Sequence, residues 1–121
     1  MKRDMDLIRA LLLHFEAKGN QEHELNTAID GYDSNVIGYH LNLMYDAGLI
    51  TAEPFTSSTS SRVYKVVPFG LTWQGHEFLD AARDNKVWET TRKKIISAVA
   101  EVPFSLLRDL LLLTLKQQLG F

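Results

Sequence analysis

The feature that most constrains this fold is a helical pattern that leads directly into a strand-like pattern. Over residues 33–47 apolar side chains recur every three or four positions, which predicts a helix with one buried face. Gly48 follows as a typical helix stop. Residues 49–67 then form two short strand-like segments around a run of hydroxyl side chains. We therefore predict an antiparallel hairpin whose turn lies within residues 54–62.

The rest of the chain is predominantly helical in its pattern. Further helices are predicted over residues 4–17, from Thr72 onward, over residues 87–99 and over residues 104–119. Residues 24–29 are short and partly alternating, which predicts a weak strand or an extended link. The expected fold is mainly α with one small β-hairpin. We assign residues 1–84 to a core and residues 85–121 to a C-terminal helical extension of the same domain.

Two segments resemble parts of winged-helix proteins. YHLNLMYDAGLI, at residues 39–50, resembles a recognition helix that passes through a glycine turn into the wing. LTWQG, at residues 71–75, resembles the segment that leads from the wing into the next helix, where Thr caps and Gly permits close backbone packing. The resemblance implies a winged-helix-like core. There is little room for the extra helix of a helix-turn-helix, so either that unit is shortened or residues 20–30 are helical.

A narrower resemblance covers nearly the whole chain. The opening MKRDMDLIRALL, the central YHLNLMYDAGLI and the later LTWQGHEFLDAARD, followed by Trp88, resemble a family of small proteins of unknown function that are frequent in bacteriophages and prophages. Members of that family also end in an apolar helix like FSLLRDLLLLTLKQQLG. The resemblance implies a bacterial or phage cytosolic setting and supplies no activity.

Composition excludes several classes of protein. The chain of 121 residues has no cysteine, so it can form neither a disulfide framework nor a thiolate zinc site. Asp4 and Asp6 interrupt the apolar stretch that a signal peptide would need. The longest apolar region, residues 98–115, contains charged residues and a proline, so we expect no membrane span and a cytoplasmic protein.

No pattern in the sequence indicates catalysis. The histidines lack the H-x-x-x-H and H-E-x-x-H spacings, and neither a G-x-S-x-G elbow nor a phosphate-binding glycine loop occurs. Glu77, Asp80 and Asp84 share one helix face, which we interpret as solvated. His40 falls on an apolar helix face, where a hydrogen-bonded core histidine is the simplest interpretation. We expect no enzyme, no cofactor, no metal and no small-molecule substrate.

The charge distribution bears on what the core binds. Residues 19–61 hold six carboxylates and no Lys or Arg, which gives this segment a charge of −6. Candidate contacts with a partner or with nucleic acid are Asn35, Asn42 and Tyr45 on the outer helix face, and Arg62 and Lys65 on the wing. Asn can read an adenine edge, but phosphate contact depends on Lys and Arg. We therefore favour a protein partner, with a duplex-DNA-binding regulator as the alternative.

The C-terminal helix is apolar on nearly all sides. A helix of that kind is either deeply buried or packed between two bodies. We expect a homodimer in which Leu106, Leu110 and Leu113 supply part of the interface. The alternative is a single enlarged core.

Overall fold

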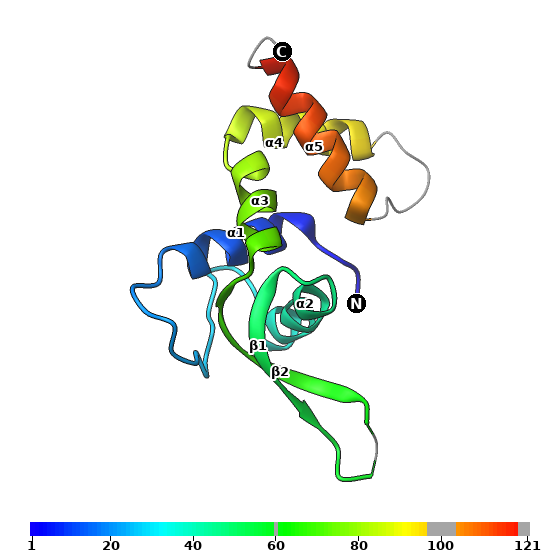
Figure 1. Cartoon of the computed structure of the whole chain (residues 1–121). Helices are drawn as coiled ribbons and strands as arrows, with labels where there is room; N and C mark the ends of the chain where they lie inside the picture. Colours follow the sequence, from blue (N-terminus) through cyan, green and yellow to red (C-terminus); the bar gives the residue numbers. More distant parts are fainter. Residues whose placement is uncertain (60, 97–103, 119–121) are drawn as a thin grey trace. The chain divides into compact units, whose positions relative to one another are not determined.

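The computed structural model describes residues 1–59, 61–96 and 104–118, and these form five helices and one antiparallel pair of strands (Figure 1). The elements are α1 (Met5–Glu16), α2 (Ser34–Asp46), β1 (Ile50–Thr56), β2 (Val63–Leu71), α3 (Trp73–Ala82), α4 (Asn85–Ile96) and α5 (Phe104–Gln118). The predicted fold, mainly α with one small β-hairpin, is confirmed. Two predicted helix ends, at residues 99 and 119, lie outside the described residues.

Short carboxylates set the beginnings of the first two helices. The side chain of Asp4 accepts a hydrogen bond from the backbone N–H of Leu7, and the side chain of Asp33 accepts one from Asn35. These bonds satisfy N–H groups that have no partner within the helix. At the other end of α2, Gly48 has a φ of 74°, a left-handed conformation that favours glycine. The predicted start and stop of this helix are confirmed.

The hairpin turn falls between Thr56 and Val63, inside the predicted window. Along β2, the three successive residues Val66, Val67 and Pro68 are all buried. Both α1 and α2 pack against β2, so side chains on both faces of the strand are covered there. The far end of the hairpin extends away from the two helices (Figure 1).

Residues 20–30, which we call the link, contain no helix. The backbone N–H of Glu24 donates to the carbonyl of Pro68 at 2.9 Å, so the link runs beside β2. The extended interpretation of this segment is confirmed, and the alternative helix over residues 20–30 is wrong. The two-helix unit of a helix-turn-helix is therefore shortened to α2 alone.

The chain forms two compact units, Met1–His76 and Glu77–Phe121. Apolar side chains of α1, α2 and the hairpin fill the core of the first unit. In the second unit α4 packs against α5, and Phe78, Leu79, Trp88 and Leu111 are buried. The expected division at residue 84 stays a prediction. Among the helices of the described part, none is both long and apolar enough to span a bilayer.

Candidate functional site

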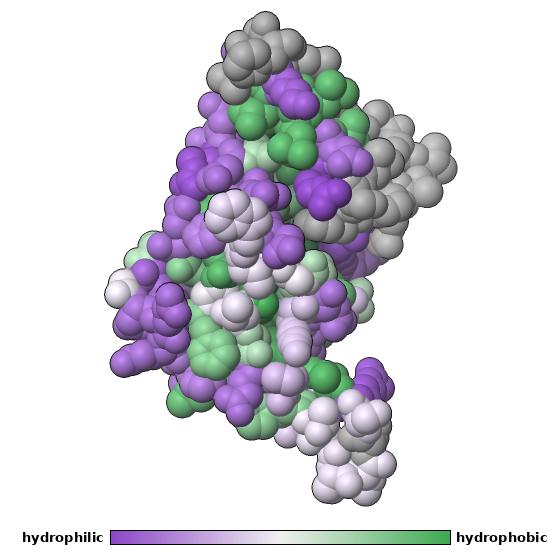
Figure 2. All heavy atoms as spheres, in the orientation of Figure 1, coloured by the Kyte–Doolittle hydropathy of each residue, from purple (hydrophilic) through white to green (hydrophobic). Residues whose placement is uncertain are grey.

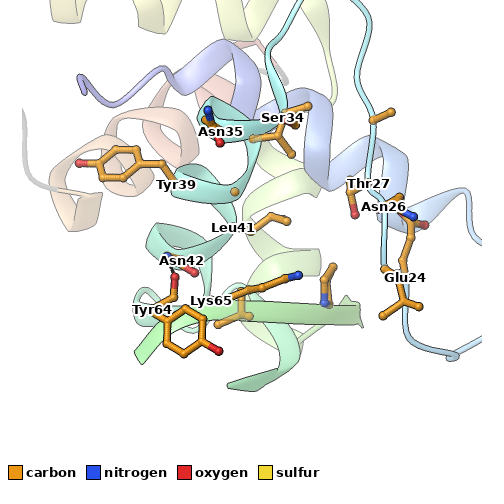
Figure 3. Close-up of a pocket in the computed structure, with 16 residues that line it drawn as sticks. Glu24, Asn26, Thr27, Ser34, Asn35, Tyr39, Leu41, Asn42, Tyr64 and Lys65 are labelled. Atoms are coloured by element: carbon orange, nitrogen blue, oxygen red, sulfur yellow. Dashed lines mark hydrogen bonds between the residues drawn. The ribbon is translucent and has the colours of Figure 1, made fainter. Parts of the chain in front are cut away.

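The first unit carries a groove of about 660 Å³ between α2, the link and β2, which we call the α2 groove (Figure 3). Three segments line it: link residues 24–28, residues of α2 between 34 and 42, and residues of β2 between 64 and 68. Its lining residues are Glu24, Leu25, Asn26, Thr27, Ala28, Ser34, Asn35, Ile37, Gly38, Tyr39, Leu41, Asn42, Tyr64, Lys65, Val66 and Pro68.

The periodicity of α2 decides which side chains reach the groove. Met44 and His40 are fully buried beneath the helix. Leu41 is 6% exposed and points from α2 towards the link in Figure 3. Asn35 and Asn42 lie on the outer side of the same helix, so the groove combines an apolar floor with amide side chains.

Three hydrogen bonds hold the link in place as the second wall. His14 Nε2 lies 2.6 Å from Glu24 Oε1, and His23 Nε2 lies 2.8 Å from Glu53 Oε2. The backbone N–H of Glu24 donates to the carbonyl of Pro68 in β2 at 2.9 Å. The link is thus attached to α1 and to both strands, although it has no helix or strand of its own.

One buried polar atom at the groove, Asn42 Oδ1, lacks a hydrogen-bond partner among the described residues. On the opposite wall, the hydroxyl of Thr27 bonds to the carboxylate of Glu24. The amide nitrogen of Asn42 donates to the carbonyl of Tyr64 at 3.3 Å, which leaves the amide oxygen as an acceptor (Figure 3). A buried polar atom without a partner costs about 1–3 kcal/mol, so the Asn42 oxygen favours a ligand that donates a hydrogen bond to it.

The carboxyl of Glu24 is more acidic than an ordinary glutamate. Burial raises its pKa, but hydrogen bonds with His14 and Thr27 and the positive charges of His14 and Lys18 outweigh burial, so the pKa lies below the usual 4.5. The folded protein therefore holds this proton less tightly than the unfolded chain. The resulting stabilisation is complete above pH 4.5 and is lost as the pH falls through the lower, folded pKa.

We expect Glu24→Gln to reduce the acid sensitivity of the first unit. The free energy of unfolding of the variant should fall less steeply below about pH 4.5 than that of the wild type. Urea titrations between pH 3 and pH 7, followed by amide hydrogen exchange in α1 and β2, measure this difference. Parallel pH profiles for the two proteins would contradict the assignment.

The groove brings together part of the predicted contact set. Asn35, Asn42 and Lys65 line it, whereas Tyr45 and Arg62 do not. Arg62 is exposed beside the hairpin turn, and Tyr45 is half-buried on α2. Sequence reasoning did not identify the contribution of the link, because the position of an extended segment depends on long-range contacts such as the pair between His14 and Glu24.

Two carboxylates of the acidic face formed by Glu77, Asp80 and Asp84 have local partners. Asp80 accepts from Arg83 at 3.0 Å, and Asp84 accepts from the backbone of Val87 at 2.9 Å as the cap of α4. In the portion of the chain that the structure describes, no three side chains of His, Asp or Glu cluster as metal ligands. His40 is buried and hydrogen-bonded at both ring nitrogens, as the sequence predicted for a core histidine.

The predicted dimer residues lie in the second unit. Leu113 is 50% exposed and Leu110 is half-buried, while the side chain of Leu106 lies outside the described part. Leu111 and Thr114 face the interior of this unit, and Leu112 is 40% exposed. Hydrophobic side chains are visible on the surface of this unit in Figure 2.

Comparison with known proteins places the chain in a family. The chain is 32% identical to an uncharacterized protein of Haemophilus influenzae over 121 residues, which cover 99% of this chain and 100% of that protein. No solved structure matches it. Residues 2–101 match a family described as hypothetical protein DUF2513, so the match includes the α2 groove and ends before α5. The chain therefore belongs to the DUF2513 family, whose function is unknown.

Proposed function

We propose that this chain is a non-enzymatic binding module that engages a protein partner through the α2 groove. The observation that carries the proposal is the chemistry of the outer face of α2. This face has no Lys or Arg, and it opens into a groove that contains an unpartnered amide oxygen of Asn42. Ligand grooves typically combine apolar walls with a few polar groups that fix orientation.

The setting of the module forms part of the same proposal. We place it in the cytoplasm of a bacterium, as a phage or prophage protein that acts on a host protein. The support is the resemblance of its three motifs to small phage and prophage proteins, together with helices too short or too polar to span a bilayer among the described residues.

An affinity experiment with a blocked groove tests the proposal. A Cβ added at Gly38 would meet nothing within 4 Å, so Gly38→Trp should fold and fill the groove. Gly19 is similarly open but lies outside the groove, so Gly19→Trp is a matched control. Nuclease-treated host lysate should yield proteins on the wild type and on Gly19→Trp, and lose them on Gly38→Trp. Equal recovery by all three would contradict groove-mediated binding.

A DNA-binding regulator is the second candidate, favoured by the exposed wing bases Arg62 and Lys65. We expect only weak binding to mixed-sequence duplex DNA at physiological salt, because the wing pair can neutralise about two phosphates per subunit. The logarithmic salt slope should be shallow, near −0.9 per contact, and Arg62→Ala with Lys65→Ala should abolish residual binding. Fluorescence anisotropy at several salt concentrations measures this. Tight binding with a steep slope would favour the regulator.

We also propose that the protein is a homodimer joined in part by α5. The exposed face of this helix includes Leu112 and Leu113, and Leu110 is half-buried. Light scattering at micromolar concentration should give the mass of a dimer for the wild type. The double variant Leu110→Glu and Leu113→Glu should give a folded monomer, because burying those carboxylates at an interface is costly. A monomeric wild type would assign α5 to the core of one chain.

A further inference from the structure

The outer edge of β2 presents backbone groups to the α2 groove. The carbonyls of Tyr64 and Pro68 point away from β1, because they accept hydrogen bonds from Asn42 Nδ2 at 3.3 Å and from Glu24 N at 2.9 Å. Residues of a strand alternate in direction, so the N–H and C=O of Val66 face the same way. Among the described residues outside the hairpin, none makes a hydrogen bond to the backbone N–H or C=O of Val66. An edge of this kind pairs with an added extended segment.

The register of the hairpin is consistent with this direction. Pro54 lies opposite Val66, and Pro68 lies opposite Ala52. Proline has no N–H, so it fits positions where the two strands exchange no hydrogen bonds. Both prolines therefore mark residues whose backbone groups face away from the partner strand, and Val66 belongs to the same set.

The buried oxygen without a partner favours a peptide over a purely apolar occupant. Asn42 Oδ1, on α2, can accept a hydrogen bond. The amides of an extended peptide lying between α2 and the link would supply that donor, while Leu41 and Ile37 offer an apolar surface for one side chain.

The charge of the walls sets the sign of the occupant. The segment of residues 19–61, which supplies the link and α2, has six carboxylates and no Lys or Arg. Asp30 and Asp33 are exposed in the connection between those two walls. Both lie beside the groove and outside its lining. The charged residues of the lining are one carboxylate, Glu24, paired with His14, and one cation, Lys65. Complementary charge favours a positively charged partner segment.

We propose that the α2 groove takes an extended basic peptide of the partner, with a central apolar side chain on Leu41 and its backbone paired with Val66. This inference rests on the proposed function, protein binding by the same groove. It adds the conformation, charge and anchor of the segment that is bound.

An array of synthetic nonapeptides tests the inference directly. Each peptide has a central Leu, Ile, Val or Phe, flanked either by Lys and Arg or by Asp and Glu, with the other positions randomised. The labelled full-length protein should be retained by the basic set at least tenfold more strongly than by the acidic set. Retention should disappear with Gly38→Trp and persist with Gly19→Trp. Retention of basic peptides by both variants would reduce the effect to surface charge and overturn the proposal.

Lys65→Glu should change the affinity for basic peptides and the affinity for duplex DNA in opposite directions. Lys65 is exposed, so the substitution leaves the core intact. Affinity for a selected basic peptide should rise by about threefold or more, because a cation in the groove is replaced by a carboxylate. Weaker peptide binding would overturn the proposal. Binding of mixed-sequence duplex DNA that exceeds peptide binding and falls in Lys65→Glu would identify nucleic acid as the ligand.

The outcomes separate this inference from the proposed function. In one outcome the array retains no peptide, while lysate proteins still bind the wild type and not Gly38→Trp. The groove then binds protein by contacts other than an extended basic peptide, and only the inference fails. If neither experiment depends on Gly38, the proposed function fails with it. Asn42→Leu supplies an independent measure, since loss of its acceptor should weaken a selected peptide by about tenfold.

Discussion

Gly75→Ala will destabilise the first unit by about 3 kcal/mol or more. A Cβ at position 75 would overlap the carbonyl oxygen of Leu49 and lie 3.1 Å from its carbon. These are backbone atoms, which a rotamer change cannot move aside. Overpacking in a closely packed region costs about 1–3 kcal/mol, and a direct backbone overlap belongs at or above the upper end.

The consequence is large because α3 begins at this contact. Thr72 Oγ1 donates to the carbonyl of Gly48 at 2.5 Å and accepts from the N–H of Gly75 at 3.0 Å. The backbone N–H of Thr72 also donates to Leu49 at 3.1 Å. Separating the two backbones would therefore break bonds that join the end of α2 to the start of α3.

Amide hydrogen exchange in α2 and β1 is the suitable measurement for this variant. Fluorescence is less informative, since Trp73 of the first unit is 75% exposed and Trp88 belongs to the second. Gly38→Ala is the matched control, because a Cβ there meets nothing within 4 Å. It should stabilise the protein by about 0.5–1 kcal/mol through the higher helix propensity of alanine. Unchanged exchange in Gly75→Ala would refute the packing argument.

His40→Ala should cost about 2–4 kcal/mol of the free energy of unfolding. The imidazole is fully buried, its Nδ1 lies 2.8 Å from the carbonyl of Val36, and its Nε2 accepts from the backbone N–H of Asp4 at 2.8 Å. This geometry requires the neutral ring with its proton on Nδ1. Alanine leaves a cavity and an N–H without its acceptor, and both effects are unfavourable.

His40→Phe separates the two contributions. Phenylalanine, which is slightly larger than histidine, fills the cavity but accepts no hydrogen bond from Asp4, which is the cap of α1. We expect it to recover part of the stability while the first turn of α1 exchanges its amide protons faster than in the wild type. Urea denaturation with hydrogen exchange measures both quantities. Full recovery of stability by Phe would show that the bond to Asp4 contributes nothing measurable.

Local rules were sufficient for the elements of this fold. The caps at Asp4 and Asp33, the stop at Gly48 and the hairpin were predictable because each depends on residues close in sequence. The burial of three successive residues in β2 was not, since it arises from two helices packing on one strand. Extended segments carry even less local information, which left residues 20–30 open between two alternatives.

The candidate site was predictable only where it lies on a regular element. The outer face of α2 follows from helical periodicity, so Asn35 and Asn42 could be identified as a candidate surface. Thr27 could not, because its place opposite α2 depends on bonds that Glu24 makes to β2 and α1. The direction of the backbone N–H and C=O of Val66 likewise depends on the register of the hairpin. The sequence placed the hairpin turn only within residues 54–62, so it did not determine that register.

The attachments of the link have a thermodynamic consequence for association. Because the bonds from Lys18 to Glu22, from Glu24 to Pro68 and from His23 to Glu53 fix this wall before any partner arrives, binding requires little ordering of the groove itself. Calorimetry on a selected peptide should then report an entropy loss that comes mainly from the peptide. Loosening the wall, for example with His23→Ala, should weaken binding through entropy while the contacts within the groove, and hence the binding enthalpy they provide, change little.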